Sequence, residues 1–215
     1  MYKAVIFDLD GTLLDTLPSL AYACNSVLES LGHPQHELDD YRLMVGKGIP
    51  NLVWQMLPEA CRETQHAEAL KQYYISYEQN LFYELAPYPA IPDLLTSLHE
   101  RGIKLAVLSN KVQEYSEQLI RSFFPGIFDC ILGDSKDYPL KPDPASATAI
   151  AASLGLDNSE ILFVGDSNVD MMTAKNAGMT ACGVSWGFRS REELQAAGAD
   201  HIVEKAEDIL ELLVK

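Results

Sequence analysis

The sequence predicts an α/β protein, a doubly wound parallel sheet with an all-helical domain inserted after the first strand. A short apolar run over residues 3–7 is typical of a buried strand. The next block shows helical spacing and no strand signal, and from Pro87 onward strands alternate with helices. We therefore expect a core domain of residues 1–15 and 86–215, and a helical cap domain of residues 16–85.

The inserted block begins with a clear helical pattern. Apolar residues recur at helical spacing from Leu17 to Leu31, and Gly32-His33-Pro34 ends the helix. After Gly46-Lys47-Gly48 the pattern predicts helices from Ile49 to Leu57 and from about Ala60 to Leu85. Helical insertions beside a strand end commonly act as lids, so we expect this block to cover a site.

The second half of the chain alternates regularly. Predicted strands cover residues 104–109, 128–132, 161–164, 180–184 and 201–203, and predicted helices cover residues 91–101, 112–124, 143–154, 168–177, 190–198 and 206–214. Two helix starts have specific signals: Asp143-Pro144 places proline at the first helical position, and Ser190-x-x-Glu193 is a capping box. Strands and helices at this spacing favour a parallel, Rossmann-like sheet.

The composition excludes several classes of partner. Asp and Glu number 31 against 16 Lys and Arg, a net charge of -15, which argues against nucleic acid and against an anionic membrane surface. No apolar run approaches the roughly 18 residues that a membrane span needs. The four cysteines are widely separated and form no metal or redox motif. We expect a cytoplasmic protein; its oligomeric state is not predicted.

Polar residues gather where the predicted strands end. Asp8 and Asp10 follow the first strand, and because they are two residues apart they project to the same side. Later strand ends and loops add Ser109, Asn110, Lys111, Lys141, Asp166, Ser167 and Asp170. In a doubly wound sheet these ends form the ligand site. Crowded carboxylates are tolerated with a cation between them, with one protonated, or in open water. Oxygen ligands with few histidines suit Mg²⁺ rather than zinc.

These residues occur as four short motifs in a fixed order. Asp8-x-Asp10-Gly11-Thr12, Ser109-Asn110, Lys141 before Pro142, and Gly165-Asp166-Ser167-x-x-Asp170 together resemble the motifs of the haloacid dehalogenase superfamily of phosphohydrolases. The helical insertion resembles the small cap of that superfamily. The segments 174–178 and 183–187 are most similar to its phosphoglycolate phosphatase branch.

The resemblance assigns the chemistry. It makes Asp8 the nucleophile, which forms an aspartyl-phosphate. It makes Asp10 the acid that protonates the leaving alkoxide and then the base that activates water. It places Mg²⁺ on Asp8, the backbone carbonyl of Asp10 and Asp166, with Asp170 either a ligand or a support. Ser109, Asn110 and Lys141 are expected to hold the phosphoryl oxygens. In the cap, Lys47 is the candidate specificity residue.

Some of these residues have simpler interpretations. Asp170 complements a helix N-terminus equally well, and Lys47 is as readily a solvated loop lysine. Arg189 is expected to cover apolar surface rather than to meet a substrate carboxylate.

The predicted activity is Mg²⁺-dependent hydrolysis of a small phosphomonoester, with 2-phosphoglycolate the leading substrate. Pyrophosphate hydrolysis, sugar-phosphate hydrolysis and β-phosphoglucomutase-type chemistry on the same core are the alternatives. A non-catalytic, phosphate-binding regulatory module is the alternative of another class. It is disfavoured because competent residues fill every catalytic position.

Overall fold

The computed structural model describes residues 2–213. Its internal contacts divide the chain into two compact units. One, the core unit, combines the N-terminal segment up to Leu14 with the chain from Pro87 onward. The other, the inserted unit, consists of Asp15–Ala86. Where the chain passes from one unit to the other, the two-residue strands β2 (Leu14–Asp15) and β3 (Ala86–Pro87) pair with each other.

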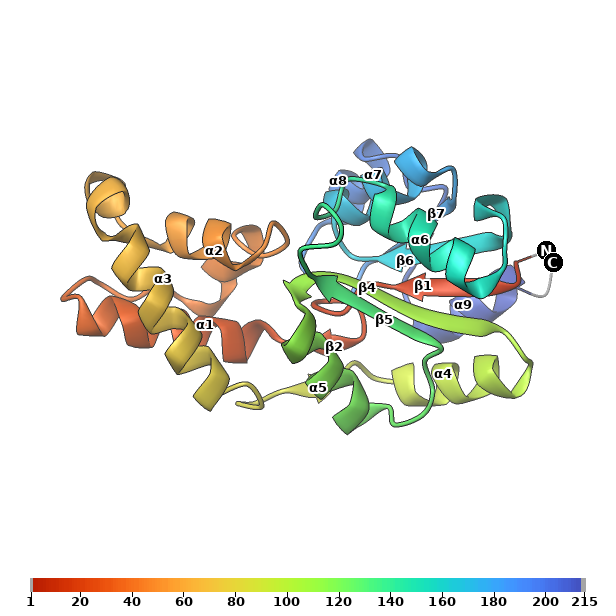
Figure 1. The fold of residues 1–215 in the computed structure, drawn as a ribbon, viewed down its shortest axis with the longest axis horizontal. Coiled ribbons are helices and arrows are strands. Elements are labelled where there is room, and N and C mark those ends of the chain that lie inside the picture. Colours follow the sequence, from red (N-terminus) through yellow and green to blue (C-terminus); the bar gives the residue numbers. More distant parts are fainter. Residues whose placement is uncertain (1, 214–215) are drawn as a thin grey trace. The chain divides into compact units, whose positions relative to one another are not determined.

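The core unit is built on a six-stranded sheet, drawn as arrows in Figure 1. Its strands are β1 (Ala4–Phe7), β4 (Lys104–Val112), β5 (Cys130–Asp134), β6 (Ile161–Gly165), β7 (Thr180–Val184) and β8 (His201–Val203). The order is β5-β4-β1-β6-β7-β8, and every neighbouring pair is parallel. The predicted fold class is confirmed. The chain runs from β1 outward to β5 and then returns to β6 on the other side of β1, so the strand order reverses at β1.

Helices cover both faces of this sheet. Helices α4 (Ile91–Glu100), α5 (Gln113–Phe123) and α9 (Ala206–Leu213) lie on one face, and α6 (Ala145–Leu154), α7 (Asn168–Ala177) and α8 (Arg191–Ala196) lie on the other (Figure 1). A buried apolar cluster on the α6 and α7 side joins Ile6, Phe163, Ile150 and Met171. Strand β1 is entirely buried, as a strand covered on both faces must be.

The inserted unit is helical. It contains α1 (Leu17–Ser30), α2 (Ile49–Met56) and α3 (Arg62–Gln79), with short 3₁₀ helices η1 (Leu38–Leu43) and η2 (Glu59–Cys61) between them. Its centre holds the fully buried rings of Tyr41, Tyr73 and Tyr77, and the last two stack with centroids 5.5 Å apart. These tyrosines therefore stabilise the packing of the inserted helices.

The structure corrects several boundaries. Helix α3 ends at Gln79 and not near Leu85. The backbone of its C-cap, Asn80, leaves the helical conformation with φ -123° and ψ 24°, and the Asn80 side chain donates to the Ser76 carbonyl. Strand β4 continues to Val112, but its pairing register shifts after Leu108. The last predicted residue of α9, 214, lies outside the described residues.

Two sequence expectations concern the whole chain. The four cysteines are free thiols. None of the helices between residues 2 and 213 is long and apolar enough to cross a membrane.

Candidate active site

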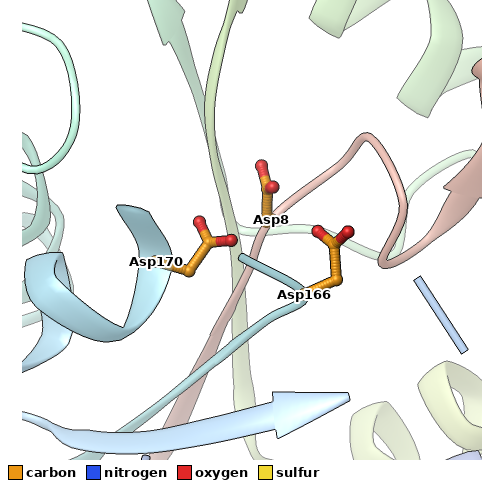
Figure 2. A group of neighbouring side chains, drawn as sticks. All are labelled: Asp8, Asp166 and Asp170. Atoms are coloured by element: carbon orange, nitrogen blue, oxygen red, sulfur yellow. The ribbon is translucent and has the colours of Figure 1, made fainter. Parts of the chain in front are cut away.

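Three buried carboxylates meet at the carboxyl end of the sheet (Figure 2). Asp8 follows β1, Asp166 follows β6, and Asp170 lies in the first turn of α7. One oxygen atom from each lies within 4.8 Å of the others. Asp166 and Asp170 are 1% and 0% exposed, so water does little to screen their charges. The reversal of strand order at β1 brings these distant residues together.

Lys141 is the cation that two of these carboxylates share. Its ammonium nitrogen lies 2.8 Å from Asp8 Oδ1 and 2.6 Å from Asp170 Oδ1, and the side chain is buried. The other Asp170 oxygen accepts hydrogen bonds from the backbone N–H and the hydroxyl of Ser167, which caps α7. Both Asp170 oxygens are therefore engaged by the protein. One completes the capping box of α7 with Ser167, and the other holds the Lys141 ammonium.

Asn110 fixes the backbone of that lysine. The Asn110 side-chain amide donates to the Lys141 carbonyl at 3.0 Å, and the Lys141 backbone N–H donates to Asn110 Oδ1 at 2.8 Å. This two-way hydrogen bond spans 31 residues of sequence and joins the end of β4 to the loop before α6. The Asn110 side chain thus orients Lys141. The sequence pattern Ser109-Asn110 does not predict this contact.

A second buried lysine pairs with the other motif carboxylate. The Lys111 ammonium lies 3.1 Å from Asp10 Oδ1, and its side chain is 1% exposed. The backbone N–H of Lys111 donates to the Ser109 hydroxyl oxygen at 3.1 Å. The motifs assign no role to Lys111. Its position directly after Ser109-Asn110, at the same strand end, is the sequence feature that could have identified it as a site residue.

Burial and crowding shift the pKa values of the buried carboxyl groups and of Lys141. Burial raises the pKa of Asp8 well above its ordinary range, and the charge of Asp170 adds to the rise. Burial and Asp170 likewise raise the pKa of Asp166 to about 7. Burial alone would lower the pKa of Lys141, but Asp170 and Asp8 outweigh it and hold that pKa above its usual value. Lys141 therefore stays charged. Its single positive charge does not offset the burial and the mutual repulsion that raise the pKa values of Asp8 and Asp166.

The donor set fits a hard divalent cation. Three convergent carboxylates present only oxygen atoms, the ligands that Mg²⁺ prefers. A cation beside Asp8 and Asp166 would reverse the rise of both pKa values, because the neighbouring positive charge favours the ionised forms. Asp170 is the least available of the three, since Lys141 and Ser167 occupy its oxygens.

Two further candidates from the sequence are Lys47 and Arg189. Lys47 is exposed and belongs to the inserted unit, so its part in specificity stays a prediction. Arg189 is half-buried in the core unit, and its charge opposes the rise of the Asp166 pKa.

A doubly wound sheet with buried carboxylates and lysines at its switch point has these residues where α/β enzymes bind their ligands. The sequence model of the haloacid dehalogenase-like hydrolase family matches residues 5–184. The chain belongs to this family, as the four motifs predict, and is a hydrolase.

Known relatives place the chain within one branch of the family. It is 34% identical over 209 residues to a phosphoglycolate phosphatase of Caulobacter vibrioides, covering 95% of this chain and 88% of the relative. It is 30% identical to the phosphoglycolate phosphatase of Aquifex aeolicus, with coverage of 98% and 96%. A crystal structure of a proposed phosphoglycolate phosphatase from Lactobacillus delbrueckii subsp. bulgaricus superimposes with a TM-score of 0.94 at 34% identity, covering 99% and 98% of the two chains. The predicted enzyme class, a phosphoric monoester hydrolase of this branch, agrees with these relatives.

The raised carboxyl pKa values predict how magnesium should affect stability. An unfolded aspartate has a pKa of about 3.9. Without a cation, the folded protein therefore holds protons that the unfolded chain releases, and its stability falls as the pH rises from about 4 through about 7. Mg²⁺ competes with these protons. We expect MgCl₂ to raise the melting temperature by about 3 °C or more at pH 8, and by clearly less at pH 5.5.

The measurement is thermal unfolding with MgCl₂ or EDTA at matched ionic strength. Asp166→Asn is the control, because it removes one titrating carboxyl and should lose most of the magnesium response. An equal shift at both pH values would contradict this prediction.

Proposed function

We propose that this protein is a Mg²⁺-dependent phosphatase that acts on a small phosphomonoester through an aspartyl-phosphate on Asp8, with 2-phosphoglycolate as the leading substrate. One observation supports it above all. The carboxylates of Asp8, Asp166 and Asp170 converge at the strand ends, with Lys141 shared by Asp8 and Asp170, in a chain of the haloacid dehalogenase-like hydrolase family. The names of the curated relatives support the substrate.

Asp8 is the proposed nucleophile. A carboxylate oxygen of Asp8 attacks phosphorus, a P–O bond forms to Asp8, and the P–O bond to the leaving alkoxide breaks. Its contact with Lys141 at 2.8 Å orients the carboxylate and partly neutralises it before an anion approaches.

Asp10 is the proposed proton carrier. It gives its proton to the departing alkoxide, so the first product leaves as an alcohol. It then takes a proton from the water that attacks the phosphorus of the intermediate, which frees Asp8 and releases inorganic phosphate. Lys111, which contacts Asp10 at 3.1 Å, holds the Asp10 carboxylate in place between these steps.

Lys141 and the Ser109 hydroxyl are proposed to hold the phosphoryl group. Lys141 and the hydroxyl of Ser109 face the oxygens that gain charge in the transition state. Asn110 contributes by fixing the Lys141 backbone. Asp8, Asp166 and the backbone carbonyl of Asp10 would hold Mg²⁺, with Asp170 as their support. When bound, the cation offsets the repulsion between Asp8 and an anionic phosphate.

Asp8→Asn should abolish turnover of p-nitrophenyl phosphate. The amide is no nucleophile, so we expect a loss of about 10³-fold or more in kcat, and EDTA should remove the activity of the unchanged protein. The matched control is Asp93→Asn, an exposed carboxylate on α4, which should keep full activity.

The intermediate can be isolated on a second variant. p-Nitrophenolate leaves without protonation, so in Asp10→Asn the first step should survive while hydrolysis of the phosphoenzyme slows. Acid-quenched protein should then carry one phosphate per chain. Turnover that persists in Asp8→Asn would contradict the covalent mechanism. Activity that EDTA does not reduce would contradict the metal requirement.

The substrate is tested by comparing kcat/KM across phosphorylated metabolites. The panel is 2-phosphoglycolate, pyrophosphate, sugar phosphates and p-nitrophenyl phosphate, and 2-phosphoglycolate should be favoured by at least about tenfold, the scale of one or two well-placed contacts. If it is no better than the generic ester, the preferred substrate is wrong. Conversion of β-glucose 1-phosphate to glucose 6-phosphate would favour the mutase alternative.

Lys47→Ala tests the proposed specificity residue on the same panel. It should lower kcat/KM for the preferred substrate by about tenfold and leave the generic ester nearly unchanged, because a specificity contact acts only on the substrate that makes it. Lys71→Ala, which also removes an exposed lysine of the inserted unit, is the matched control. Equal losses on both substrates would remove Lys47 from the site.

A further inference from the structure

The loop after β7 closes around Asp166. The backbone N–H of Phe188 donates to Asp166 Oδ2 at 2.7 Å, and the hydroxyl of Thr12 donates to Asp166 Oδ1 at 3.2 Å. Each oxygen of this carboxylate therefore accepts a hydrogen bond from the protein. The two donors lie 22 residues after Asp166 and 154 residues before it in the sequence. A carboxylate held at both oxygens cannot rotate without breaking one of these bonds.

Trp186 links the two donors. Its indole N–H donates to the backbone carbonyl of Thr12 at 3.1 Å, across 174 residues of sequence. The indole is half-buried, and its ring lies 6.5 Å from the ring of Tyr88. The backbone N–H of Tyr88 in turn donates to the Leu13 carbonyl, next to Thr12. The indole is thus fixed against the same turn that carries the Thr12 hydroxyl.

Two glycines leave just enough space for this arrangement. A Cβ atom on Gly187 would collide with Asp166 Cβ, and it would approach the Gly11 carbonyl oxygen. A Cβ atom on Gly11, whose φ of +80° already favours glycine, would collide with Asp166 Oδ2. The two loops therefore touch the carboxylate directly. Asp166, Thr12, Trp186 and Phe188 form a closed chain of contacts through the backbone of the β7 loop.

We propose that Trp186 is a positioning residue for Asp166: it acts through Thr12 and thereby sets the affinity of the site for Mg²⁺. The inference rests on the proposed function, since Asp166 is there a magnesium ligand. In this proposal Trp186 is neither a magnesium ligand nor a substrate contact. Its indole holds the Thr12 carbonyl, and so keeps the Thr12 hydroxyl aimed at Asp166. Groups that orient metal ligands in this way typically change metal affinity about 10- to 100-fold when removed.

The test is calorimetric titration of the whole protein with MgCl₂, which needs no turnover. Thr12→Val removes the hydroxyl that contacts Asp166 and should weaken Mg²⁺ binding by about tenfold or more. Trp186→Phe acts one contact further away and should weaken binding by about three- to tenfold. Thr12→Ser keeps the hydroxyl and should bind as the unchanged protein does. Trp54→Phe, in the inserted unit, is the matched control and should have no effect.

The double variant tests whether the two residues act in series. If Trp186 works through Thr12, then Thr12→Val combined with Trp186→Phe should bind Mg²⁺ no more weakly than Thr12→Val alone. Additive losses would overturn this route. Should Trp186→Phe fold poorly, judged by thermal unfolding in EDTA, benzothienylalanine at position 186 keeps the bicyclic shape and lacks only the N–H donor.

The possible failures are distinguishable. If the unchanged protein binds no Mg²⁺, the magnesium dependence of the proposed function is overturned. If it binds Mg²⁺ and Trp186→Phe or the benzothienylalanine protein binds equally well, the positioning role alone is overturned.

Discussion

The repulsion among three buried carboxylates is the constraint on which the rest of the site depends. Asp8, Asp166 and Asp170 bring oxygens within 4.8 Å of one another, and Lys141 is shared between two of them. In a buried setting this arrangement raises proton affinity, as the pKa of about 7 for Asp166 shows. The surrounding contacts are therefore best understood as the means of holding these charges together in one geometry until a cation or an anionic substrate joins them.

The sheet topology makes that convergence possible. Strand β1 lies at the centre, with β4 on one side and β6 on the other, so residues separated by more than 150 positions follow adjacent strands. The backbone is rigid there because β1 is buried on both faces and paired along both edges. The shift of register after Leu108 then frees the end of β4 from regular pairing, and this places Asn110 against the Lys141 backbone. Regular pairing positions the strand ends, and a local irregularity positions the side chains.

Periodicity and motif order are enough to predict the fold class and the acidic residues of the site. Alternating strands and helices are visible as patterns of apolar residues, and Asp8, Asp166 and Asp170 stand at or just beyond the ends of predicted strands. The predicted helix over α3 runs too far because the residues after Gln79 keep a helix-like composition, and only the Asn80 cap ends it. The donors to Asp166 escape prediction for another reason. Phe188 acts through its backbone N–H, which every residue except proline possesses, so no side-chain pattern marks it.

Charge balance explains why two lysines are buried beside so many acids. Asp8, Asp10, Asp166 and Asp170 carry four negative charges when ionised, and Lys111 and Lys141 supply two positive ones. A single divalent cation would make this set neutral, whereas a monovalent ion would leave an excess that repels phosphate. The protein as a whole carries a net charge of -15, so a favourable field for an anion must be created locally. The two buried lysines and a divalent cation would together offset the four carboxylates, because each lysine remains close to a carboxylate and is little screened by water.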